Sequence, residues 1–131
     1  MKNKSTLAKE YYSQTNTNCA QGTLCAFCKE ANISNEMAMK VATGFGGGIR
    51  DKEVCGAVTG AIMALGLILG QKSEDDVESK QKASELTINF NKKFKEKHGS
   101  LVCRDLKDRD ICPQLVADGA EILDNLLNTK V

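Results

Sequence analysis

The sequence predicts an all-α fold, a single-domain bundle of about six helices around a buried central helix at about residues 52–70. Apolar residues recur at helical spacing along the chain, and no stretch alternates apolar and polar residues as strands do. The segment 54–69 has no charged residue, and a helix that is apolar all round is buried or crosses a membrane. At 131 residues the chain has the size of one domain, so we expect residues 1–131 to form a single all-helical, cysteine-containing domain.

The first third of the chain is expected to form three helices. A first helix fits residues 3–13, and Asn18 can cap a second helix that begins near Cys19 and ends near Asn32. Ser34 or the residue after it can cap a short third helix, which Gly44 would stop. The apolar residues that suit this third helix are Met37, Ala38 and Val41.

The glycine-rich run 44–48 leads into the central helix. It lacks the third glycine of a dinucleotide fingerprint and the Gly-Lys-Ser/Thr of a phosphate loop, so we expect a sharp backbone turn. Asp51 or Lys52 would open the central helix, which is too short and too glycine-rich for the about 20 apolar residues of a membrane span. One side of this helix carries only small residues, which are Gly56, Gly60 and Ala64. This side would let a neighbouring helix of the same chain, or a homodimer partner, pack closely against it.

The remaining chain is expected to form two long helices joined by a loop. Ser73 can cap the first, which ends at His98-Gly99, with His98 on the surface. Its expected core stripe is Ala83, Leu86, Phe90 and Phe94. A loop covers 100–113, where Pro113 fits a first helical position and makes Cys112 the N-cap. The last helix would pack inward Val116, Ala120, Leu123 and Leu127.

The composition of the chain argues against some classes of function. The formal net charge of +1, the absence of a basic stripe and the few aromatic residues give no support for nucleic-acid binding. The N-terminus lacks the apolar core of a signal peptide, so we expect a cytoplasmic protein that is not membrane-embedded. In that reducing compartment, six cysteines are expected to be redox thiols or metal ligands rather than structural bridges.

Three cysteines fall near expected helix starts. Cys19 begins the second helix, Cys55 lies about one turn into the central helix, and Cys112 precedes the last helix. Free N–H groups and the helix dipole at such positions favour thiolate and can lower a thiol pKa below about 8.5. The alternative is that Cys55, Cys103 and Cys112 are small buried apolar residues.

Cys25 and Cys28 form a Cys-x-x-Cys pair that would place both thiols on one helical face. A thioredoxin-type motif would need a preceding strand, and a c-type haem site would need histidine where Lys29 stands. A disulfide or metal is compatible with the spacing, but no second pair follows at zinc-ribbon spacing. We therefore expect packing to be the main role of this pair.

The ordered motifs of the chain resemble the C_GCAxxG_C_C family of bacterial and archaeal proteins, which are described as redox-active and share four cysteines. The segments that carry the resemblance are Asn18–Gln21, Gly44–Gly48, Cys55–Ala61, Ser100–Leu106 and Cys112 with Val116. The resemblance spans about residues 11–127 and implies that the four family cysteines are Cys19, Cys55, Cys103 and Cys112. After Cys103 the chain departs from the family, which more often has a leucine-glycine turn there.

The resemblance leaves two functions open at these four cysteines. In the first, catalytic thiols cycle between dithiol and disulfide with an unknown redox partner, Cys103 and Cys112 being one natural closing pair and Cys55 or Cys19 the other thiol. In the second, the same four thiolates are metal ligands for an iron–sulfur cluster or zinc. Similarity of the family to part of the split-Soret cytochromes favours a cluster, and its frequent genomic company with transport genes suggests a membrane-transporter accessory.

Overall fold

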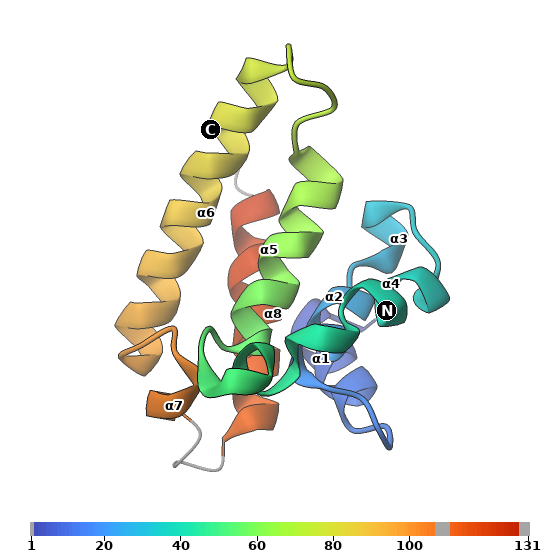
Figure 1. The fold of residues 1–131 in the computed structure, drawn as a ribbon, viewed down its shortest axis with the longest axis vertical. Coiled ribbons are helices and arrows are strands. Elements are labelled where there is room, and N and C mark those ends of the chain that lie inside the picture. The colour runs from blue at the N-terminus through green and yellow to red at the C-terminus, as the bar shows by residue number, and fades with distance from the viewer. Residues whose placement is uncertain (1, 107–110, 129–131) are drawn as a thin grey trace.

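The computed structural model describes residues 2–106 and 111–128, which form an all-α fold (Figure 1). The α-helices are α1 (Lys4–Tyr12), α2 (Cys19–Cys25), α3 (Cys28–Ala31), α4 (Asn35–Val41), α5 (Gly56–Leu69), α6 (Val77–His98), α7 (Cys103–Leu106) and α8 (Cys112–Asn128). A 3₁₀ turn η1 (Thr43–Phe45) and an irregular turn η2 (Gly48–Lys52) connect α4 to the segment before α5. The predicted fold class is thus confirmed.

The N-terminal helices begin at the predicted caps. The side chain of Asn18 accepts a hydrogen bond from the Gln21 N–H, and the Gln21 side chain accepts one from the Asn18 N–H, which completes a capping box at the start of α2. Ser34 likewise accepts from the Met37 N–H at the start of α4. The predicted second helix is interrupted at Ala26–Phe27.

Helix α5 is the centre of the bundle. It contacts α2, α6 and α8, while α1 packs against α2 and α8 (Figure 1). The largest fully buried side chains of the core are Phe27, Phe90, Phe94, Leu24, Leu65, Leu106, Leu115 and Leu123. Helices α5 and α6 extend together away from α1–α4, so the N-terminal helices cover one end of a longer helical arm (Figure 1).

The small-residue side of α5 packs within the chain. A Cβ added at Gly60 would lie 2.6 Å from the Ala20 carbonyl oxygen, and one at Gly56 would lie 2.8 Å from the Ala20 nitrogen. Ala64 is also fully buried. Gly56 and Gly60 therefore serve the α2–α5 contact, and the alternative of a homodimer packed through this side of α5 has no free surface here.

Several predicted boundaries are wrong. The central helix begins at Gly56 rather than near residue 52, because the preceding residues form η2 and an extended segment. Asp76, not Ser73, caps α6 by accepting from the Ser79 N–H. Helix α8 begins at Cys112, one residue before the predicted start. The interrupted second helix and the short α7 in the predicted loop bring the number of α-helices above about six.

Side-chain burial also departs from the prediction at a few positions. Met37 and Val41 of α4 are exposed, and only Ala38 of that helix is buried. On α6, Phe90 and Phe94 are buried as predicted, but so is His98, which was expected on the surface. In the described residues, no helix is long and apolar enough to cross a membrane.

Candidate functional site

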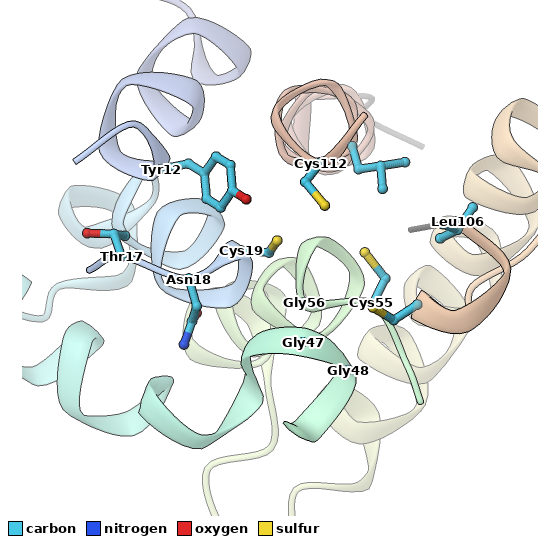
Figure 2. A pocket seen from close by; sticks show the side chains of 12 residues that line it. Tyr12, Thr17, Asn18, Cys19, Gly47, Gly48, Cys55, Gly56, Leu106 and Cys112 are labelled. Atoms are coloured by element: carbon cyan, nitrogen blue, oxygen red, sulfur yellow. The ribbon is translucent and has the colours of Figure 1, made fainter. Parts of the chain in front are cut away.

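Four thiols line one cavity of about 200 Å³ at the end of the bundle that α1 and α2 cover. They belong to the four cysteines predicted as site residues, Cys19, Cys55, Cys103 and Cys112. Figure 2 shows the Cys19, Cys55 and Cys112 sulfurs directed into a shared space, with the Tyr12 hydroxyl turned toward the same space. The structure brings these residues together, and their chemical role stays a prediction.

Cys19 is held by the cap of α2. It is the first residue of that helix, and the Asn18 side chain that caps it also donates hydrogen bonds to the carbonyl oxygens of Ala42 and Thr43, both at 3.2 Å. A Cβ added at Gly46 would meet Asn18 at 2.6 Å, so the glycine-rich run approaches this cap closely. The cap thus ties Cys19 to the segment that leads toward Cys55.

Cys55 and Cys103 are held by two short extended segments that pair with each other. The Cys55 N–H donates to the Leu101 carbonyl at 2.8 Å, and the Cys103 N–H donates to the Glu53 carbonyl at 2.6 Å. An isolated antiparallel bridge joins Val54 and Val102 between them. Residues almost fifty positions apart therefore fix both thiols against the start of α5.

The glycine-rich turn forms one wall of the cavity. Gly47 and Gly48 line it with φ values of 60° and 68°, in the left-handed region that suits glycine. A Cβ on Gly48 would lie 2.8 Å from the Cys103 Cβ and 2.5 Å from the Glu53 nitrogen. The predicted sharp turn is confirmed, and its second glycine lets the backbone lie against Cys103.

Cys112 enters the cavity from the first residue of α8. The Leu115 N–H donates to the Ile111 carbonyl at 2.9 Å, which closes the first turn of this helix. The chain departs from the family pattern directly after Cys103; residues 104–106 of that stretch belong to α7, and residues 107–110 lie outside the described residues.

Tyr12 is a site residue that the sequence analysis missed. It is the last residue of α1, and its hydroxyl is turned into the cavity that Cys19 and Cys112 line (Figure 2). Burial, together with the negative charge that Cys19 and Cys112 carry as thiolates, raises the pKa of Tyr12. No motif marks Tyr12, although a phenol on the apolar face of a helix usually needs a polar partner.

The expectation that helix starts lower the thiol pKa is wrong for two of these cysteines. Burial is the largest effect at Cys19 and raises its pKa to about 12, with further increases from Cys55 and Cys112. Burial also raises the pKa of Cys55 to about 11, although the N–H groups of Ala57 and Val58 act in the opposite direction. The helix start does favour thiolate at Cys55, but desolvation outweighs it.

The cavity brings together cysteines that no disulfide links. All six cysteines of the chain are free thiols. In residues 2–106 and 111–128, no three His, Cys, Asp or Glu side chains stand in an arrangement that could hold a metal ion. Cys25 and Cys28 line a different cavity, consistent with their separation from the four-cysteine set.

Comparison with known proteins bears on this site. A family model described as "Putative redox-active protein (C_GCAxxG_C_C)" matches residues 17–126, a span that includes the four cavity cysteines. No curated protein and no solved structure matches the chain.

Proposed function

Because the chain belongs to the C_GCAxxG_C_C family, whose description is "Putative redox-active protein", we propose that it performs thiol–disulfide exchange in the four-cysteine cavity. The observation that carries this proposal is the convergence of four free thiols from separate segments on one cavity of about 200 Å³. Which two of the four thiols react depends on how they lie relative to one another. The reducing cytoplasm expected from the sequence would keep them in the thiol form between turnovers.

Cys19 and Cys112 are the pair that the contacts favour as the reactive dithiol. Cys112 contributes to the raised pKa of Cys19, and both thiols contribute to the raised pKa of Tyr12, so the three groups interact closely. Both are partly exposed, whereas Cys55 and Cys103 are buried. The pairing differs from the Cys103–Cys112 closure expected from the sequence, because the pairing of residues 53–55 with 101–103 holds Cys103 close to Cys55.

The proposed step is a two-electron exchange with a disulfide substrate. The Cys112 thiolate attacks one sulfur of the substrate, whose S–S bond breaks and releases one thiolate. Cys19 then loses its proton and attacks Cys112, which forms the Cys19–Cys112 disulfide and releases the second thiol. The protein is oxidised, and the substrate is reduced to two thiols.

The electrostatics of the cavity assist the second half of this step. The charge of a Cys112 thiolate helps to raise the pKa of Cys19, and this charge disappears once Cys112 enters a mixed disulfide. The Tyr12 hydroxyl stabilises the Cys19 thiolate by hydrogen bonding. Cys19 is thus easier to deprotonate when its attack is required, and it serves as the resolving thiol.

The test is disulfide mapping of anaerobically purified, reduced protein after titration with a small disulfide. We expect the number of free thiols among the four cavity cysteines to fall by two, with Cys19 and Cys112 linked. The Cys112→Ser variant should lose this reaction, whereas Cys19→Ser should accumulate a mixed disulfide on Cys112. Linkage of other cavity cysteines first, or unchanged oxidation of Cys112→Ser, would overturn the assignment.

A second candidate is metal binding, favoured by the same convergence of four thiols, which are the ligand set of zinc and [2Fe–2S] sites. Cys19, Cys55, Cys103 and Cys112 would have to move closer together to hold the ion or cluster, because no three such side chains of the described residues stand in an arrangement that could hold a metal ion. Their protons would be released on binding. Metal analysis and a visible spectrum of anaerobic protein decide between the candidates. Visible absorbance of an iron–sulfur centre that is lost in Cys55→Ala would replace the exchange proposal.

A further inference from the structure

A second pair of thiols lies where α2 meets α3. Cys25 ends α2 and Cys28 begins α3, and their side chains are 3% and 8% exposed. Both line a separate cavity of about 420 Å³. Seven residues of α2 rise about 10 Å at about 1.5 Å each, which separates this pair from Cys19 at the other end of the helix.

The backbone between the two cysteines is suited to disulfide closure. In an unbroken helix, residues three apart have Cβ atoms about 5–6 Å from each other. A disulfide joins Cβ atoms about 3.5–4.5 Å apart. Phe27, with φ −110° and ψ 11°, interrupts the helix between Cys25 and Cys28. Because of this interruption, Cys25 and Cys28 can form a disulfide without breaking a continuous helix.

The two thiols interact and are not equivalent. Burial raises the pKa of both, and it raises that of Cys25 to about 12. The interaction between them lowers the pKa of Cys28 and raises that of Cys25 further. The Cys28 thiol itself donates to the Ser34 carbonyl oxygen at 3.7 Å, a bond that its ionisation must break. Cys28 is also the more exposed thiol. Cys28 is therefore the better attacking sulfur.

The charged residues of this cavity are mainly cationic. Lys2, Lys4 and Lys29 line it together with one acid, Glu30. Lys4 pairs with Glu30 at 2.7 Å and lies 5.4 Å from the centroid of the Phe27 ring. A small disulfide that carries carboxylates would be attracted here more strongly than a neutral one.

We propose that Cys25 and Cys28 form a second redox dithiol, independent of the four-cysteine cavity, that is oxidised by an anionic low-molecular-weight disulfide. The Cys28 thiolate attacks one sulfur of the small disulfide, forming a mixed disulfide and releasing one thiolate. Cys25 then loses its proton and attacks Cys28, which forms the Cys25–Cys28 bond and releases the second thiol. Two electrons pass to the small disulfide, which ends as two thiols.

The experiment treats the reduced full chain with glutathione disulfide without oxygen, blocks the remaining thiols at intervals, and locates each modified cysteine by fragmentation mass spectrometry. Fragmentation is needed because no lysine or arginine separates Cys19 from Cys28. We expect Cys25 and Cys28 of the wild type to disappear as thiols together. Cys25→Ser should trap glutathione on Cys28, and Cys28→Ser should slow modification of Cys25 by about tenfold or more. Cys112→Ser should leave the reaction at Cys28 unchanged.

A charge-reversal variant tests whether this cavity prefers an anionic disulfide to a neutral one. Lys29→Glu should slow the reaction of Cys28 with glutathione disulfide but not with the neutral bis(2-hydroxyethyl) disulfide. Equal effects on both reagents would overturn the preference for an anionic substrate. The dithiol itself would be overturned if Cys25 and Cys28 of the wild type persist as thiols while Cys19 and Cys112 oxidise, a result that needs no variant to fold.

Discussion

The Nε2 atom of His98 lies 2.9 Å from the Oδ2 atom of Asp118, joining the end of α6 to the middle of α8 inside the core. The two side chains are 8% and 4% exposed. The other carboxylate oxygen of Asp118 accepts a hydrogen bond from Gln114 at 2.8 Å and pairs with Lys97 at 3.3 Å. The Phe94 ring packs against His98 with centroids 4.9 Å apart. His98 is therefore a structural residue of the α6–α8 contact.

We predict that His98→Ala lowers the free energy of unfolding by about 1–3 kcal/mol, because it removes a hydrogen bond from a buried carboxylate. Urea denaturation measures this loss. Lys97→Ala is the matched control. The Lys97 side chain is half exposed, so its ion pair with Asp118 should contribute at most about 1 kcal/mol to the free energy of unfolding. Thiol oxidation in the four-cysteine cavity should be unchanged in His98→Ala, and a loss above about tenfold (about 1.4 kcal/mol) would contradict a purely structural role.

Tyr12→Phe should slow the reaction of Cys19. The Tyr12 hydroxyl lowers the pKa of Cys19 by hydrogen bonding, so its removal raises that pKa further and reduces the thiolate fraction at a given pH. The rate of Cys19 alkylation, followed by mass spectrometry across a pH series, should fall by about threefold to tenfold, with its profile moved to higher pH. Tyr11→Phe is the control, because the Tyr11 hydroxyl contacts Asn35 instead. Equal profiles for both variants would remove Tyr12 from the site.

The features that could be predicted from the sequence are those set by nearby residues. Helix caps at Asn18 and Ser34 depend on side chains within three positions, and both are confirmed. The left-handed Gly99 that ends α6 is a local signal of the same kind. The four site cysteines were identified by motif resemblance, and the structure places them in one cavity.

The features that were missed depend on contacts between distant segments. Helix α5 begins at Gly56, later than predicted, because residues 53–55 pair with residues 101–103. No local sequence pattern predicts this pairing. Burial likewise decides the thiol pKa values, and burial of Cys19 and Cys55 follows from how α2 and α5 pack. Tyr12 joins the site only because α1 lies against α2 and α8.

The reduced protein should lose stability at alkaline pH. In the native state the pKa of Cys19 is raised from 9.0 to about 12, and that of Cys55 from 9.0 to about 11. Between pH 9 and these raised values, both thiols keep their protons in the native state but lose them in the unfolded state. Stability therefore falls as pH rises above about 9. Urea midpoints of reduced protein at about pH 7 and about pH 10 measure the loss. Cys19→Ala should show a smaller loss, and an identical pH dependence would contradict this origin.

Gly60→Ala should destabilise the protein even though alanine favours helices. A Cβ at Gly60 would lie 2.6 Å from the Ala20 carbonyl oxygen, so α2 and α5 must separate, at a cost of about 1–3 kcal/mol. Gly66→Ala on the same helix is the matched control, because a Cβ there has nothing within 4 Å and alanine stabilises an exposed helix by up to about 1 kcal/mol. Unfolding free energies of opposite sign are expected for the two variants. A stabilised Gly60→Ala would mean that α2 does not lie against α5 as described, and the position of Cys19 beside Cys55 would be lost with it.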